Sequence, residues 1–110
     1  MRTSWLIVVI VACLAVVSCR QHDFKTVNIH VPEMKNKACA QIIANAVLRL
    51  PGVKRDEIVV DVRSRTITVT YDSLVLGMKN IEFAVAEAGF AANDIPAKQE
   101  AVEKLPLECK

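Results

Sequence analysis

The sequence lacks the features that mark several common classes of protein. Its basic residues are scattered and aromatic residues make up only 5% of the chain, so no basic patch interleaved with aromatic side chains indicates nucleic-acid binding. It has no phosphate loop, nucleophile elbow or acid–base pair, so we expect no enzyme. It also has no long linker, internal repeat or low-complexity segment. A chain of 110 residues has room for one small domain.

The longest apolar run lies at the N-terminus and is too short to span a membrane. It extends from Trp5 to Val17 and follows a single charged residue, Arg2. A membrane-spanning helix needs roughly 20 apolar residues. Because the run is shorter and ends in small residues, we interpret residues 1–18 as a signal peptide.

A cysteine follows this run directly. The stretch VVSC, Val16 to Cys19, resembles a bacterial lipobox, in which the cysteine is acylated and becomes the mature N-terminus. We therefore expect lipidation of Cys19, a tether over residues 19–23, and a membrane-anchored, extracytoplasmic protein. The stretch IVAC, ending at Cys13, fits more loosely and leaves a very short apolar region before it. The alternative is an ordinary cleaved signal peptide with a free Cys19.

Two hydrophobic periodicities alternate in the rest of the chain. Apolar and polar side chains alternate over residues 24–31, 57–64 and 65–72, which predicts three strands, the last two joined as a hairpin. Apolar residues at spacings of three and four predict helices over residues 36–50 and 76–88. A short last strand is expected in FAANDIP, residues 90–96.

The order β-α-β-β-α-β predicts an α+β fold. Each strand has one apolar face and each helix one apolar stripe, and these are buried together in the ferredoxin-like arrangement. It has two helices on one face of a four-stranded antiparallel sheet. We assign residues 24–96 to this domain. Residues 97–110 form a polar C-terminal tail, with one or two helical turns before Pro106.

Several stretches of the domain resemble the heavy-metal-associated domain family. They are VNIHVPEMKNKACAQIIANAVLRLPGV, ITVTYD and IEFAVAEAGF. The family comprises small βαββαβ modules of copper chaperones, metal-transporting ATPases and mercury-binding proteins. The resemblance implies binding or transfer of Cu(I) or another soft transition metal. It also implies a metal-transport protein as partner. A second copy of the chain is the other partner we consider, because tethering to a membrane raises the local concentration of a loop with one thiol.

The metal motif of this family, M-x-C-x-x-C, lies between the first strand and the first helix. In the matching stretch MKNKAC, Met34 corresponds to the methionine and Cys39 to the second cysteine, whereas Asn36 occupies the position of the first cysteine. The resemblance therefore implies Cys39 as a thiolate ligand. Met34 could add a thioether, although the family methionine usually packs inward. Asn36 is a poor Cu(I) ligand but a good helix cap.

Cys109, in the tail, offers a second sulfur. If the tail folds back, Cys39 and Cys109 could coordinate one soft cation, near-linearly for Cu(I). They could equally form a disulfide, because the expected compartment is oxidising. A third interpretation is a metal-free interaction module in which Cys39 is a small core residue on the apolar helix face. Metal binding is our main hypothesis.

Overall fold

The fold comes from a computed structural model that describes residues 3–9 and 21–110. Residues 3–9 are helical. None of the helices in the described ranges is long and apolar enough to cross a membrane. The predicted end of the signal peptide and the expected lipidation site, Cys19, lie outside these ranges.

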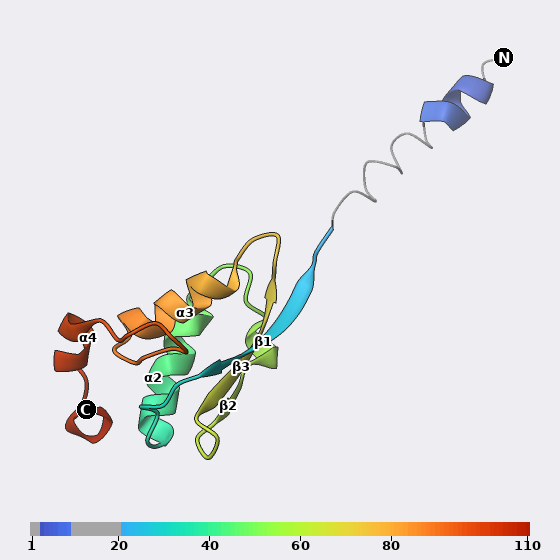
Figure 1. Ribbon diagram of the computed structural model, residues 1–110. Helices are drawn as coiled ribbons and strands as arrows, with labels where there is room; N and C mark the ends of the chain where they lie inside the picture. The colour runs from blue at the N-terminus through green and yellow to red at the C-terminus, as the bar shows by residue number, and fades with distance from the viewer. Residues whose placement is uncertain (1–2, 10–20) are drawn as a thin grey trace.

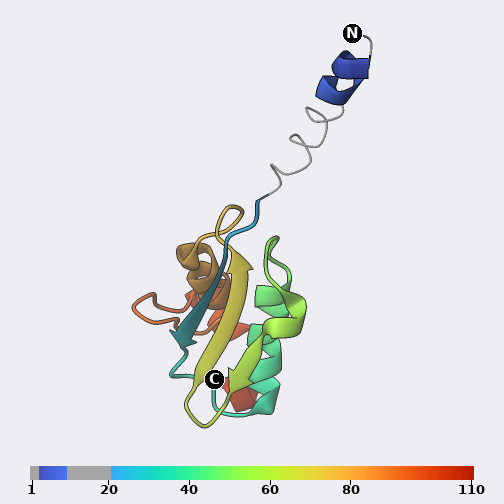
Figure 2. The same cartoon turned by 90° about the vertical axis from the view of Figure 1, so that its right-hand side faces the viewer.

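The domain is an α+β structure with a three-stranded antiparallel sheet in the order β1-β3-β2. Two helices, α2 and α3, cover the same face of this sheet (Figures 1 and 2). The elements are β1 (Phe24–His30), α2 (Lys37–Leu48), the 3-10 turn η1 (Arg55–Glu57), β2 (Val59–Asp61), β3 (Thr66–Asp72), α3 (Met78–Glu87), α4 (Gln99–Glu103) and the 3-10 turn η2 (Leu107–Cys109).

The core forms where the apolar faces of the sheet and the helices meet. Alternate residues of a strand point to one face, so Ile29 in β1 and Ile67 and Val69 in β3 are fully buried. Residues three or four apart on a helix share a face, which buries the apolar side of α2 and α3. Those helical core residues are Cys39, Ile43, Val47, Ile81 and Val85.

The predicted fourth strand is not present in the part of the chain that the structure describes. Residues 90–96 instead contain a tight turn closed by a bridge between Ala92 and Ile95, with a positive φ of 50° at Asn93. Asn93 donates its N–H to the His30 carbonyl and accepts the His30 N–H on Oδ1, both at 2.9 Å. Asn tolerates this backbone conformation, and Pro96 has no N–H for a ladder. Asn93 therefore forms the hydrogen bonds to the end of β1, in the segment that was expected to form a strand.

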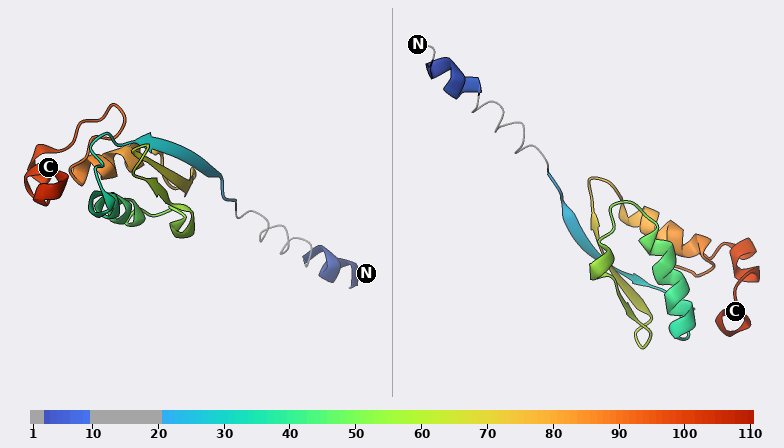
Figure 3. Two further views of the ribbon diagram at one scale, coloured as in Figure 1. Left: turned by 90° about the horizontal axis from the view of Figure 1, so that it is seen from below. Right: turned by 180° about the vertical axis from the view of Figure 1, so that it is seen from behind.

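The C-terminal tail packs against the domain. The Lys98 N–H donates to the Ala86 carbonyl at 2.9 Å, which fixes the tail at the end of α3. Leu105 is buried over Gly89, whose φ is 103° and where a Cβ atom would lie 3.0 Å from Leu105 Cδ1. The glycine ends α3 and also makes room for this side chain. The tail then turns back toward the start of α2 (Figure 3).

The Asp72 side chain, at the end of β3, forms hydrogen bonds that hold the N-terminal end of the domain. Its carboxylate hydrogen-bonds the His22 imidazole at 2.9 Å and accepts the backbone N–H groups of Leu74 at 3.0 Å and Asp23 at 3.2 Å. These bonds, that from His22 first, hold the pKa of the Asp72 carboxyl below its ordinary value of 3.8.

We expect Asp72 to make stability depend on pH. Because the pKa of the folded-state Asp72 carboxyl is lowered, its contribution to the free energy of unfolding is fully present above the ordinary value of 3.8. This contribution is lost as the pH falls below about 5 and through the folded-state pKa. Urea unfolding across this range should show that Asp72→Asn flattens the decline in the free energy of unfolding. The matched control is Asp56→Asn, at an exposed position. If the free energy of unfolding falls equally steeply with pH in the parent and in Asp72→Asn, this pH dependence does not come from Asp72.

Candidate functional site

Cys39 and Cys109 are joined by a disulfide, with Cα atoms 5.6 Å apart and a sequence separation of 70. Cys39 is on the first turn of α2, and Cys109 ends η2. Their exposed fractions are 0% and 2%. The structure therefore brings together the two sulfurs that the sequence singled out, in the bonded form that was one of the alternatives.

Asn36 connects the two sides of this site. Its Oδ1 accepts the Cys39 N–H at 3.0 Å and caps α2, an interaction that typically contributes about 1 kcal/mol. Its Nδ2 donates to the Glu108 carbonyl at 3.3 Å. The neighbouring Lys35 ammonium donates to the Lys110 carbonyl. The loop before α2 thus binds the backbone of the turn that carries Cys109.

The position at a helix start favours a thiolate once the disulfide is reduced. The first turn of α2 carries no acidic side chain. The N–H groups at the helix start and the helix dipole favour negative charge placed beside them. Cys39 is therefore placed where the reduced sulfur can act as an anionic ligand.

Met34 lies in the core, fully buried. Its N–H donates to the Val31 carbonyl at 3.1 Å, which forms the turn after β1. The thioether is thus directed into the domain in the cluster that also contains Cys39, and its observed contribution is to the shape of the loop.

The donor set restricts the ion that could bind. Among residues 3–9 and 21–110, no group of three or more His, Cys, Asp or Glu side chains is placed to hold a metal ion. Two sulfurs alone suit a soft cation of low coordination number, such as Cu(I). They do not complete the four-ligand shell that structural zinc requires.

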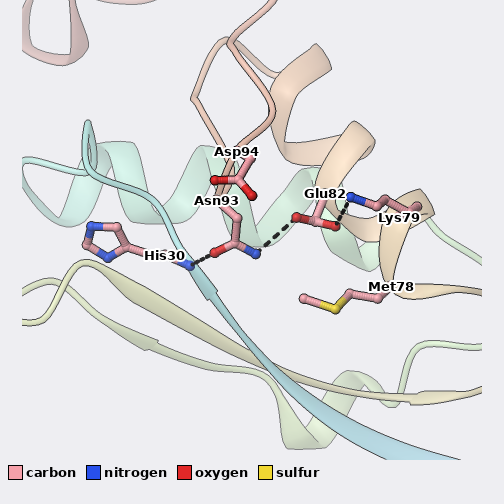
Figure 4. Close-up of a pocket in the computed structure, with 6 residues that line it drawn as sticks. All are labelled: His30, Met78, Lys79, Glu82, Asn93 and Asp94. Carbon is pink, nitrogen blue, oxygen red and sulfur yellow. Dashed lines mark hydrogen bonds and ion pairs between the residues drawn. The ribbon is translucent and has the colours of Figure 1, made fainter.

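A second polar cluster lies between the end of β1 and α3 (Figure 4). Glu82, only 3% exposed, accepts a hydrogen bond from Asn93 Nδ2 at 3.0 Å and pairs with Lys79 at 3.5 Å. The carboxylate thereby holds the turn that replaces the fourth strand. Sequence analysis missed this role of Glu82, because an acidic residue on a helix resembles any solvent-exposed one. The available signal was Asn93, a residue suited to positive φ.

Fold and site together define a ferredoxin-like domain with a pair of sulfurs at its first loop–helix junction. The sequence profile of the heavy-metal-associated domain matches residues 28–91. The chain therefore belongs to the heavy-metal-associated domain family, which confirms the resemblance noted in the sequence. No curated protein is similar enough in sequence to count as a match.

Solved structures of the same fold include mercury and copper proteins. Oxidized MerP from Ralstonia metallidurans CH34 is 27% identical, with a TM-score of 0.61 over 64% of this chain and 96% of that one. The mercury-bound form of MerP, a periplasmic protein of the bacterial mercury detoxification system, is 27% identical, with a TM-score of 0.56 over the same shares. A copper form of a CopA variant from Bacillus subtilis is 26% identical, with a TM-score of 0.57 over 67% of this chain and 95% of that one.

Proposed function

We propose that this chain is an extracytoplasmic lipoprotein, anchored through Cys19, that binds and transfers a soft metal ion such as Cu(I) between Cys39 and Cys109. The observation that carries the proposal is the meeting of two sulfurs, 70 positions apart, at the junction where the family motif lies. The mercury-bound and copper-bound relatives support the choice of a soft ion. The proposed role is binding, without catalysis.

The disulfide is the oxidised, metal-free state of this proposed site. A dithiol reductant supplies two electrons and two protons, the S–S bond breaks, and the reductant leaves as its own disulfide. Cu(I) then displaces the two protons and is held by two thiolates. The Asn36 cap and the amides of α2 do not depend on the disulfide and remain to stabilise the charge.

Delivery of the ion requires access to buried sulfurs. The turn η2 covers Cys39, and within it Leu107 and Glu108 are exposed. Movement of this short turn would let an incoming thiol reach the metal. We propose a metal-transport protein or a second copy of the chain as the source of that thiol.

An anaerobic Cu(I) titration of residues 21–110 against a chromophoric chelator tests the site. We expect the reduced domain to compete for one equivalent of Cu(I), since it holds one pair of thiolates. The oxidised domain, Cys39→Ser and Cys109→Ser should each lose this competition. Retained binding in either single variant, or none in the reduced parent, would refute the two-sulfur site.

A second candidate function follows from the burial of both cysteines. Thiol–disulfide exchange requires access to a sulfur, and these residues are 0% and 2% exposed. The bond then serves as a structural disulfide, and the chain binds no metal. Reduction of the folded domain distinguishes the two candidates, because a structural disulfide should resist a dithiol reductant until the domain unfolds, whereas the metal site requires the folded domain to be reduced.

A further inference from the structure

An exposed apolar tip lies on the turn between β3 and α3. Leu74 and Val75 are adjacent in the sequence and 64% and 57% exposed, whereas the next residue, Leu76, is buried. The Asp72 carbonyl accepts the N–H groups of Val75 and Leu76, both at 3.0 Å, and its carboxylate accepts that of Leu74. The tip therefore has a fixed shape, and little conformational entropy remains to be lost when it is buried.

The loop that contains Gly52 packs against one side of the tip. Gly52 has a φ of 89°, and a Cβ atom there would lie 3.1 Å from the Val75 side chain. The Asp72 N–H donates to the Gly52 carbonyl at 2.8 Å. The two loops consequently form one rigid end of the domain.

This end is also where the chain enters the domain. The Ser73 N–H donates to the Asp23 carbonyl at 2.7 Å, and the Asp72 carboxylate bonds both Asp23 and His22. In Figure 1 the turn before α3 lies beside the beginning of β1. In Figure 2 the C-terminus, close to Cys109, lies at the opposite end. The tip and the sulfur pair are thus at opposite ends of the domain.

Chain length places this end close to the proposed lipid anchor. Asp23 is four positions after Cys19 in the sequence, and such a segment spans at most about 14 Å. Phe24, also exposed, lies at the same end, with the Lys54 ammonium 4.5 Å from its ring centroid. Aromatic rings with nearby cations suit the polar–apolar boundary of a bilayer.

We propose that Leu74 and Val75 contact the bilayer and orient the lipidated domain so that Cys39 and Cys109 face away from the membrane. The inference rests on the lipidation of Cys19 in the proposed function, but not on metal binding. We expect the tip to contact the lipid surface to which the chain itself is tethered, because the last residue of the tether, Asp23, is hydrogen-bonded to Ser73, the residue next to the tip. Other exposed apolar side chains, such as Phe83 and Leu107, lie on other elements.

A site-specific environment-sensitive fluorophore tests this orientation. The full lipidated chain would be labelled at Leu74→Cys or at Ser64→Cys, in the hairpin at the far end, and reconstituted into vesicles of phosphatidylethanolamine and phosphatidylglycerol. Without reductant the native pair Cys39–Cys109 is closed and only the introduced thiol reacts. At position 74 we expect blue-shifted emission and about fivefold less quenching by iodide than at position 64.

A second set of variants separates the tip from a general apolar effect. We expect a fluorophore at Lys54→Cys, beside Phe24 at the same end of the domain, to be protected from iodide as well. The double change Leu74→Asp and Val75→Asp should abolish this protection. Phe83→Asp, an exposed apolar position on α3, should leave it intact. Circular dichroism would verify that each variant is folded.

The outcomes distinguish this inference from the proposed function. Equal quenching at positions 64 and 74 in a chain that floats with the vesicles would overturn the orientation and leave lipidation standing. A chain that does not float with the vesicles would overturn the lipid anchor and the orientation together. Neither result bears on the Cu(I) titration, which uses the domain without its anchor.

Discussion

Reduction of the Cys39–Cys109 disulfide is expected to lower the free energy of unfolding of residues 21–110 by about 3–4 kcal/mol. The bond joins positions 70 residues apart, and closing so long a loop removes much of the conformational freedom of the unfolded chain. For a domain of this size the melting temperature should fall by roughly 15–25 °C.

Thermal unfolding under anaerobic conditions, with and without dithiothreitol, measures this difference. Cys109→Ala is the matched control, because it has no bond to reduce and should melt at the same temperature in both conditions. A melting temperature that dithiothreitol leaves unchanged, in a parent sample whose two thiols are shown to be reduced, would contradict the expected stabilisation.

The reduced domain should nevertheless remain folded. Attachments of the tail that do not involve sulfur remain, among them the Leu105 side chain over Gly89 and the bonds from the Lys98 N–H to the Ala86 carbonyl and from Asn36 Nδ2 to the Glu108 carbonyl. After reduction these contacts keep the turn that carries Cys109 near Cys39. A tethered second thiol has a high effective concentration, as a shared metal site requires.

Replacing Asn36 with cysteine in a chain that lacks Cys109 is expected to restore tight Cu(I) binding. Asn36→Cys with Cys109→Ser should bind at least about 100-fold more tightly than Cys109→Ser alone, because two thiolates converge on a soft ion where one cannot hold it. Position 36 is the N-cap of α2 and its Oδ1 already reaches the Cys39 N–H at 3.0 Å. A sulfur there would lie at the same helix start.

Competition with a chromophoric chelator measures this gain, with Asn36→Ser in the same background as control. Serine preserves a capping oxygen but adds no thiol, so its affinity should stay at the level of Cys109→Ser. If the double variant binds no better than this control, the loop no longer has the shape that the family motif requires.

Hydrophobic periodicity by itself determined most of the fold. Alternation in β1 and β3 predicted which residues are buried, and spacings of three and four predicted the core faces of α2 and α3. Asn36 marked the start of a helix because capping is a local property of the chain. The family resemblance is confirmed for the same reason, since it depends on local stretches that include the loop around Met34.

Only the tertiary structure decided how the distant segments meet. The predicted fourth strand is a turn because Asn93 finds partners in His30 and Glu82, from two other elements. The tail reaches the first loop because Leu105 fits over Gly89, a contact that no periodicity encodes. Whether two cysteines 70 positions apart lie within bonding range depends on the whole packing of the chain. Sequence could name both sulfurs, but only the three-dimensional fold placed them side by side.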